Sequence, residues 1–316
     1  MSIVAEPEAQ FRQAMGLLAD PGEVPEFAKA VELIEGSAAC GYAPAIERRA
    51  LLECKGLDRP PDWNKALDSL VEAAERGSDL AARQLILFAE DRFEASATAP
   101  PEGWRKLRSR IQIGRRLQPP PPGGQTLSVD PLVHARPGFA TAAECRWLIA
   151  AAESRLERAT IYSGADGVDD SRTNRYAVFD LANFDLVTEM IQTRIANEIG
   201  APLPLLEVPQ VLHYAVGQEF APHYDFLDPR RFGGEIARLG QRAATFLIYL
   251  NADYEGGETS FPRLGIAHRG TTGDALVFGS LDGAGQPDFR TQHAGLPPTR
   301  GEKWVFSQWV RDRSPG

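Results

Sequence analysis

The 316-residue chain has few cysteines, a deficit of positive charge and no long apolar segment. Its three cysteines (Cys40, Cys54 and Cys145) are odd in number and far apart, which argues against a disulfide framework and favours a reducing compartment. The formal net charge of -9 argues against nucleic-acid binding through bulk electrostatics. No apolar run approaches the roughly 20 residues of a membrane helix, and the N-terminal residues do not read as a signal peptide. We therefore expect a soluble cytoplasmic protein that binds neither nucleic acid nor a membrane.

Proline and glycine are abundant, with 24 and 29 residues, and four consecutive prolines (119–122) precede Gly123 and Gly124. Such a run favours an extended spacer, to which the glycines add a bend. Residues before the run show helical spacing, whereas β-branched and aromatic runs broken by Gly and Pro follow it. We predict a helical domain over 1–118, a linker over 119–130 and a second domain over 131–316.

The first part contains a repeat with a period of 36 residues. Segments that begin at Ala30 and Ala66 align Gly41 with Gly77. Each unit predicts two helices joined by a glycine turn, and such units bury their apolar faces only by stacking. Over about residues 8–90 the pattern resembles Sel1-like, TPR-related repeats. The resemblance implies a protein-binding surface, and simple packing on the second domain is the alternative.

The second part carries two metal-binding residue types at strand spacing. Residues 208–214 predict a strand, Gly217 a turn, and His223-Tyr224-Asp225 follows. In an extended chain, residues i and i+2 face the same side, so His223 and Asp225 present an imidazole and a carboxylate together. These are two of the three ligands of a 2-His-1-carboxylate site, which suits non-haem Fe(II). Alone, the pair is more often an ordinary surface or core pair, so a third ligand is needed.

Four other histidines are available as the third ligand. His134 precedes the domain core, His213 alternates away from its neighbour on the strand, and His268 lies in a predicted loop. His293 lies just before a proline-containing turn and a final strand, so it is the best candidate. His268 is the second choice.

The final predicted strand, residues 303–310, places a lysine on a face that otherwise points inward. Lys303, Val305, Ser307 and Trp309 share this face. A buried ammonium is costly unless it is paired, so an anionic ligand is the economical partner for Lys303. An exposed edge-strand lysine is the alternative.

Together these pieces resemble the prolyl 4-hydroxylase-like branch of the 2-oxoglutarate/Fe(II) oxygenases. The matching segments are LHYAVGQEFAPHYDF, RAATFLIYLNADYEGGETSFP, GDALVFGSLDGAG and TQHAGLPPTRGEKWVFSQWVRD, within about residues 130–312. The resemblance implies a double-stranded β-helix (jelly roll) with flanking helices, for which 141–157 and 186–200 are candidates. The expected fold class is α+β, with a Sel1-like solenoid first. Residues 226–241 suggest a loop near the mouth.

The resemblance implies a role for each matching position. His223, Asp225 and His293 would hold Fe(II), Lys303 would bind the distal carboxylate of 2-oxoglutarate, and Tyr214 would donate its hydroxyl to this cosubstrate.

Further positions match more loosely. Thr259 and Trp309 would line the same pocket. Arg242 would point at the substrate, with a salt bridge at the rim as the alternative. Residues 172–174 resemble a substrate-side segment, although Asn174 replaces the serine that is more usual there.

The implied activity is that of a 2-oxoglutarate-dependent dioxygenase. It would hydroxylate a prolyl residue of a peptide or protein, recruited by the repeats, with Fe(II) and O2 and with succinate and CO2 as coproducts. Ascorbate is a further candidate cofactor. The intact Asp225 favours hydroxylation over halogenation. Two alternatives stay open: a hydroxylase of a free amino acid or other small molecule, and a non-catalytic scaffold that senses iron or oxygen.

Overall fold

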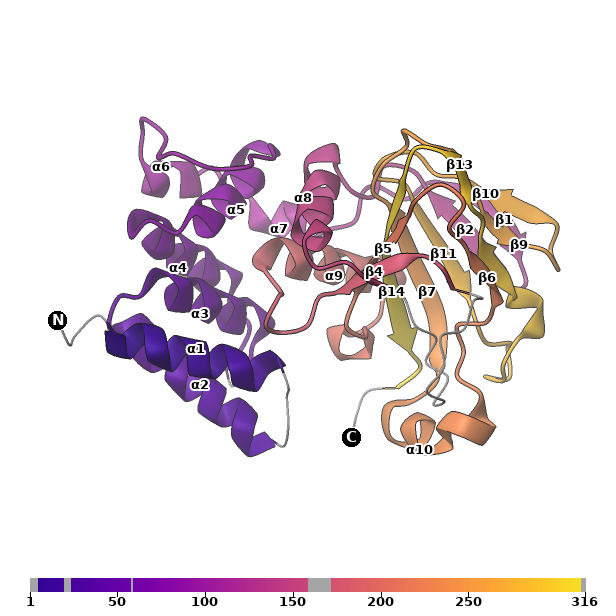
Figure 1. Cartoon of the computed structure of the whole chain (residues 1–316), viewed down its shortest axis with the longest axis horizontal. Coiled ribbons are helices and arrows are strands. Elements are labelled where there is room, and N and C mark those ends of the chain that lie inside the picture. Colours follow the sequence, from indigo (N-terminus) through magenta and orange to yellow (C-terminus); the bar gives the residue numbers. More distant parts are fainter. Residues whose placement is uncertain (1–4, 20–23, 58, 159–171, 314–316) are drawn as a thin grey trace. The chain divides into compact units, whose positions relative to one another are not determined.

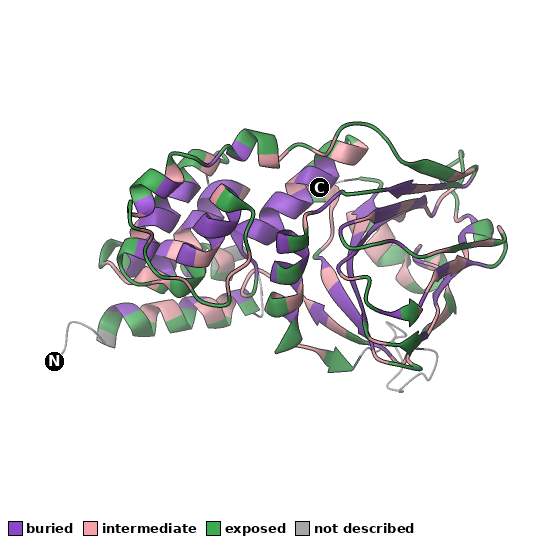
Figure 2. Cartoon of the chain, turned by 90° about the horizontal axis from the view of Figure 1, so that it is seen from above, coloured by how far each residue is buried: buried purple, intermediate pink, exposed green. Residues whose placement is uncertain are grey.

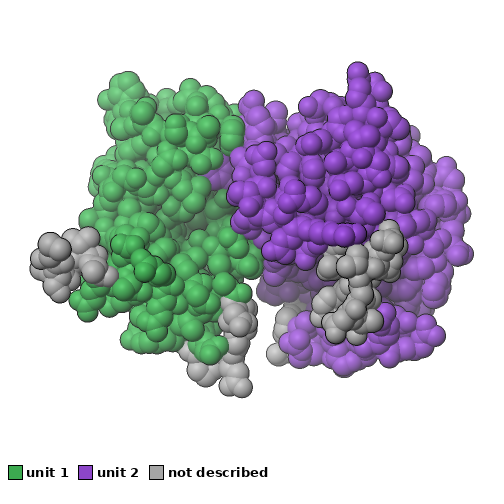
Figure 3. Space-filling view, viewed as in Figure 1, with its two compact units in different colours: residues 1–118, 179–194 green, residues 119–178, 195–316 purple. Residues whose placement is uncertain are grey.

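The computed structural model describes residues 5–19, 24–57, 59–158 and 172–313. Contacts between Cα atoms group the chain into two compact units, which Figure 3 colours separately. Unit 1 comprises residues 1–118 and 179–194, and unit 2 comprises residues 119–178 and 195–316. One division falls at the start of the proline run. Residues 179–194, which we expected in the second domain, pack with the helical unit instead.

Unit 1 consists of helices that follow one another along the chain (Figure 1). They are α1 (Ala5–Ala19), α2 (Val24–Ala39), α3 (Ala43–Lys55), α4 (Trp63–Glu75), α5 (Asp79–Glu90), α6 (Trp104–Arg108) and α7 (Ile113–Arg116). Gly41 between α2 and α3 has a φ of 83°, and Gly77 between α4 and α5 has a φ of 92°. Glycine adopts such angles without steric cost, so the two glycines aligned by the sequence period occupy equivalent turns.

Polar side chains bind residues 179–194 to unit 1. The Arg48 guanidinium donates hydrogen bonds to the carbonyl oxygens of residues 181, 182 and 184 at distances of 2.8 to 3.1 Å. The Lys55 ammonium forms an ion pair with Glu189 of α9 (Leu186–Ile199). The helix predicted over 186–200 is thus confirmed, and the division between the units falls within it.

Unit 2 contains antiparallel sheets. An eight-stranded sheet has the order β1-β2-β11-β7-β14-β5-β4-β3 and a four-stranded sheet the order β10-β9-β12-β6, while β13 pairs with β8. The larger sheet consists of β1 (Gln125–Val129), β2 (Leu132–Arg136), β3 (Glu157–Arg158), β4 (Arg175–Val178), β5 (Gln210–Tyr214), β7 (Arg242–Tyr249), β11 (Ala275–Gly279) and β14 (Lys303–Arg311). The remaining strands are β6 (Phe220–His223), β8 (Glu255–Gly256), β9 (Thr259–Phe261), β10 (Ile266–His268), β12 (His293–Gly295) and β13 (Pro298–Arg300).

Side chains from both principal sheets meet in one core. The ring of Phe261 on β9 lies 5.0 Å from that of Phe278 on β11, and both rings contact the imidazole of His293. Figure 2 shows buried residues along strands of the sheet domain. The core joins Phe261 of the smaller sheet to residues of the larger one, in which β7, β14 and β5 are neighbours.

Unit 2 also contains helices. The helix predicted over 141–157 is confirmed as α8 (Ala142–Glu153), where Thr141 and Glu144 form a reciprocal capping box. Residues 226–241, which we expected to be a loop, contain the helix α10 (Pro229–Leu239), capped by Asp228. Among the described residues, no helix has both the length and the apolar character needed to cross a bilayer.

The architecture is therefore α+β: a helical N-terminal region precedes a mostly antiparallel β-sheet domain.

Candidate active site

Three sequence-predicted ligand residues meet at one point of unit 2. His223 ends β6, Asp225 follows it in a bend, and His293 begins β12, where it pairs with His223 across the sheet. The two Nε2 atoms lie 3.7 Å (His223) and 3.4 Å (His293) from oxygens of the Asp225 carboxylate. The potential ligand atoms of the three residues all lie within 4.8 Å of one another. His268, our second choice, is not part of this cluster.

Backbone carbonyls fix both imidazoles in the orientation that a metal requires. Nδ1 of His223 lies 2.8 Å from the Ala221 oxygen, and Nδ1 of His293 lies 3.1 Å from the Thr291 oxygen. Since a carbonyl only accepts, each Nδ1 carries the proton, and each Nε2 keeps its lone pair towards the cluster. Such outer hydrogen bonds orient the histidine ligands of metal sites.

The electrostatics of the cluster suit a divalent cation. Burial, assisted by His293, lowers the pKa of His223 to about 3, although Asp225 opposes this shift. Burial alone would raise the pKa of Asp225, but the two imidazoles and the Thr245 hydroxyl outweigh it and hold the pKa below its usual value. The cluster offers two imidazole nitrogens and one carboxylate, the donor set of non-haem Fe(II) sites. The residues present therefore fit this metal.

A small cavity connects the cluster to a buried lysine. Its lining includes His223, Asp225, His293, Tyr214, Thr259, Lys303, Phe220, Arg172 and Trp309. Lys303 is 1% exposed, and its Nζ lies 5.0 Å from the centre of the Tyr214 ring. Within the part of the chain that the structure describes, this Nζ has no ion pair and no hydrogen bond. Burial lowers the pKa of Lys303 to about 7, against an opposing effect of Glu258.

Tyr214 faces the same cavity from the neighbouring strand. Tyr214 on β5 is the cross-strand neighbour of Lys303 on β14. Burial raises the pKa of Tyr214 to about 12, so the hydroxyl stays protonated and can donate a hydrogen bond. A Cβ atom at Gly295 would lie 2.9 Å from this hydroxyl oxygen, which explains the glycine. Thr259 is also buried and accepts a hydrogen bond from Tyr249 at 2.9 Å.

A larger cavity of about 560 Å³ adjoins the first. Arg172, Gln210 and Trp309 line both cavities. The other residues that line the larger cavity are mostly apolar and include Leu205, Leu206, Val208, Leu227, Leu239 and Tyr176. The guanidinium of Arg172 lies 4.4 Å from the centre of the Phe220 ring, which stacks on the His223 imidazole at 3.4 Å. Arg172 and Phe220 therefore link the lining of the larger cavity to the three-residue cluster.

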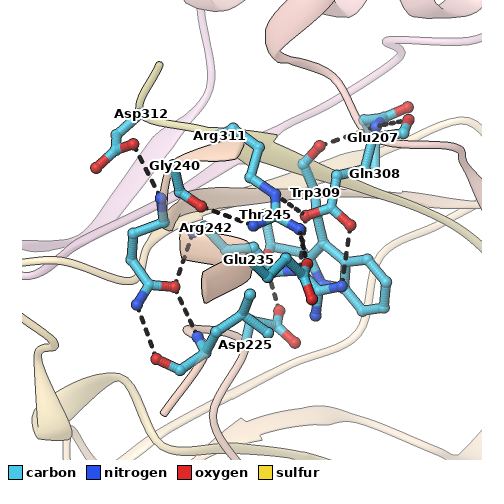
Figure 4. A network of polar contacts seen from close by, with 12 residues as sticks. Glu207, Asp225, Glu235, Gly240, Arg242, Thr245, Gln308, Trp309, Arg311 and Asp312 are labelled. Carbon is cyan, nitrogen blue, oxygen red and sulfur yellow. Dashed lines mark hydrogen bonds and ion pairs between the residues drawn. The ribbon is translucent and has the colours of Figure 1, made fainter. Parts of the chain in front are cut away.

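Arg242 lines the larger cavity, but its charge is already matched. Its Nε and Nη2 atoms donate to the two carboxylate oxygens of Glu207 at 2.7 and 2.9 Å, and its guanidinium lies 3.5 Å from the Trp309 ring centre (Figure 4). Arg311 binds the same carboxylate at 2.6 Å. This is the salt bridge at the rim that we gave as the alternative for Arg242.

Two contributors to the site escaped the sequence analysis. Thr245 on β7 donates a hydrogen bond to Asp225, and Phe220 stacks on His223. The period of two along β7 was the available signal for Thr245, because residues 245, 247 and 249 share one face. Leu247 lines the small cavity from that face.

Comparisons with known proteins show which family this chain is similar to. Residues 209–311 match the family model described as the 2OG-Fe(II) oxygenase superfamily. "Prolyl 4-hydroxylase 1" of Arabidopsis thaliana is 32% identical over 208 residues, which cover 60% of this chain and 72% of the relative. "Probable prolyl 4-hydroxylase 9" of the same plant is 30% identical over 209 residues, which cover 60% and 72%. Among solved structures, the viral collagen prolyl hydroxylase of Paramecium bursaria Chlorella virus-1 in its 2OG complex is 29% identical, with a TM-score of 0.46 and coverage of 57% of this chain and 95% of that one.

The chain belongs to the 2-oxoglutarate/Fe(II) oxygenases, and within them to the prolyl 4-hydroxylase-like family. It is a 2-oxoglutarate-dependent dioxygenase, which uses Fe(II), 2-oxoglutarate and O2.

Proposed function

We propose that this enzyme hydroxylates a prolyl residue of a peptide or protein. We also propose that its two principal sheets form a double-stranded β-helix, which contains the active site. His223, Asp225 and His293 would hold the iron. The observation that carries the proposal is the position of Lys303, a buried lysine whose Nζ has no ion pair or hydrogen bond among the described residues, in the same cavity as the three ligands. An iron site and an anion site in one small cavity fit a chelating dicarboxylate such as 2-oxoglutarate.

The side chains of the cavity divide the work of binding. Lys303 would pair with the distal carboxylate of 2-oxoglutarate, and the protonated Tyr214 hydroxyl would donate to the same cosubstrate. The chemistry that bound Fe(II) supplies is activation of O2, which oxidises 2-oxoglutarate to succinate and CO2 and hydroxylates a C–H bond. Phe220, Thr259 and Trp309 would keep water out of the cavity.

A peptide substrate is supported by the larger cavity. It shares Arg172, Gln210 and Trp309 with the small cavity that the three-residue cluster lines, and its apolar walls suit the ring of a prolyl residue and its neighbours. The relatives are named as prolyl 4-hydroxylases. Arg242 and Arg311 pair with Glu207 and Glu235, so Arg172 is the cation of this lining that has no carboxylate partner among the described residues.

The test is a turnover assay on two substrate classes, with Fe(II), 2-oxoglutarate and ascorbate. Proline-containing peptides and free amino acids are each incubated with the wild type and with Asp225→Ala, and succinate and a mass gain of one oxygen are measured. We expect both products from a peptide, and neither from the variant. Oxygen transfer to free amino acids alone would select the small-molecule alternative. A wild type that forms no succinate with any substrate would favour the scaffold.

We also propose that unit 1 is a Sel1-like solenoid that recruits the protein substrate. The equivalent glycine turns at Gly41 and Gly77 support the repeat. Hydrogen–deuterium exchange on the full chain, with and without a substrate protein, tests recruitment. Slower exchange within residues 24–90 is expected. Slower exchange confined to unit 2 would refute recruitment.

We further propose that the protein acts in the cytoplasm. Cys40, Cys54 and Cys145 are all free thiols in the structure, as expected in a reducing compartment. Fractionation of the source cells tests this, and recovery outside the cytoplasm would refute it.

A further inference from the structure

A threonine of the larger sheet touches the carboxylate of the candidate iron site. Thr245 lies on β7 and is 1% exposed, and its hydroxyl donates a hydrogen bond to Oδ2 of Asp225 at 2.5 Å (Figure 4). Asp225 itself lies in a bend next to the smaller sheet. The hydrogen bond therefore ties a ligand residue, held by a short bend, to the central part of the larger sheet.

The two oxygens of this carboxylate have different surroundings. Oδ2 accepts from Thr245, whereas Oδ1 has no hydrogen bond within the described residues. The hydrogen bond occupies one lone pair of Oδ2 and withdraws electron density from it. Oδ1 keeps its full capacity as a metal ligand.

This asymmetry has a consequence for the number of positions at the metal. An octahedral ion held by two imidazoles and one carboxylate oxygen keeps three positions. A 2-oxo acid takes two of them, and O2 needs the third. A carboxylate that bound through both oxygens would occupy one of these three.

We infer that Thr245 is a positioning residue that makes Asp225 a one-oxygen ligand, so that all three positions stay open. The inference rests on the proposed function of the cluster as an iron site. Outer hydrogen bonds of this kind typically change metal affinity about 10- to 100-fold when they are removed. The sequence around Thr245 places it three residues after Arg242, on the face of β7 that also carries Leu247.

The experiment uses Co(II) as the probe, added to the metal-free full-length protein. Thr245→Val removes the hydroxyl but keeps the shape, and Thr245→Ser keeps the hydroxyl. We expect the Co(II) dissociation constant to rise about 10- to 100-fold in the valine variant and its visible d–d band to change. The serine variant should stay within about threefold of the wild type, since its hydroxyl keeps this outer hydrogen bond. Thermal unfolding of the metal-free proteins serves as the control for folding.

Three results would overturn the inference. Equal Co(II) affinity and an unchanged band in the valine variant would show that the hydroxyl does not act on the ligand. An equal loss in the serine variant, which keeps the hydroxyl, would show that the loss of affinity does not come from the missing hydrogen bond. No Co(II) binding by the wild type would overturn the metal site itself, together with this inference. If the valine variant does not fold, Thr245→Ala replaces it with the same expected loss of affinity.

Discussion

The charge state of Lys303 should control the affinity for 2-oxoglutarate. Burial lowers the pKa of this lysine to about 7 in the ligand-free enzyme. Only the protonated form pairs with a carboxylate, so above pH 7 each pH unit should weaken 2-oxoglutarate binding about tenfold. Removing one partner of a buried pair typically costs about 3–5 kcal/mol, so Lys303→Ala should raise the dissociation constant by at least about 100-fold.

A rise in pH has opposite effects on the two quantities: it weakens 2-oxoglutarate binding but stabilises the ligand-free fold. An unfolded lysine has a pKa of about 10.4, so between pH 7 and that value the unfolded chain binds more protons than the folded one. The free energy of unfolding of the ligand-free enzyme should therefore rise with pH across this window. The destabilisation from burying this lysine is fully present below pH 7 and is gone only as the pH approaches the unfolded pKa of about 10.4.

The assay is an anaerobic titration of 2-oxoglutarate into the Fe(II)-loaded enzyme, followed by the metal-to-ligand absorption band, between pH 6 and 9. His223 does not titrate in this range, because its pKa is lowered to about 3. Lys303→Arg is the matched control, since arginine stays charged throughout and its affinity should not change with pH. A dissociation constant of the wild type that is equally flat between pH 7 and 9 would refute the role of the lysine.

Three other changes give direct tests. Gly295→Ala places a methyl group 2.9 Å from the Tyr214 hydroxyl oxygen, so it should weaken 2-oxoglutarate binding in the same titration while Co(II) binding persists; unchanged 2-oxoglutarate affinity would contradict the close approach. Arg48→Met removes three hydrogen bonds to the backbone of residues 181–184 and should lower the free energy of unfolding in urea by about 2 kcal/mol or more, whereas no change would mean that water replaces the guanidinium. Deletion of residues 1–118 leaves Glu189 and the apolar side chains of α9 without their packing, and should yield aggregated protein in size-exclusion chromatography. A monodisperse truncated protein would contradict this expectation.

Local patterns in the sequence were sufficient for the helices and strands near the site. Thr141 and Glu144, three residues apart, form the capping box that starts α8, and the alternation predicted along residues 303–310 corresponds to β14. These signals lie within a few neighbouring residues, where backbone geometry and side-chain spacing decide the structure.

The place of residues 179–194 could not be predicted in this way. Arg48 binds carbonyl oxygens more than 130 residues further along the chain, and a carbonyl is present at every position. No side-chain pattern in residues 181–184 therefore marks them as its partners. The same limit applies to Thr245, a common residue whose importance depends on a bend from another part of the chain.

The distribution of paired and unpaired cations separates structural from ligand-binding roles around the two cavities. Arg242 and Arg311 share Glu207, and Arg311 also pairs with Glu235, so two carboxylates compensate the two charges within the fold. Lys303 and Arg172 are 1% and 8% exposed and have no carboxylate partner in the described ranges, and burial lowers the pKa of each. A sequence shows all four as basic residues on predicted strands or loops, and spacing alone does not tell which of them finds an acid. Because an uncompensated buried charge destabilises a protein, two of them beside one site indicate groups whose compensation comes from ligands. Lys303 would receive it from the cosubstrate carboxylate, and Arg172, between the two cavities, from polar groups of the substrate.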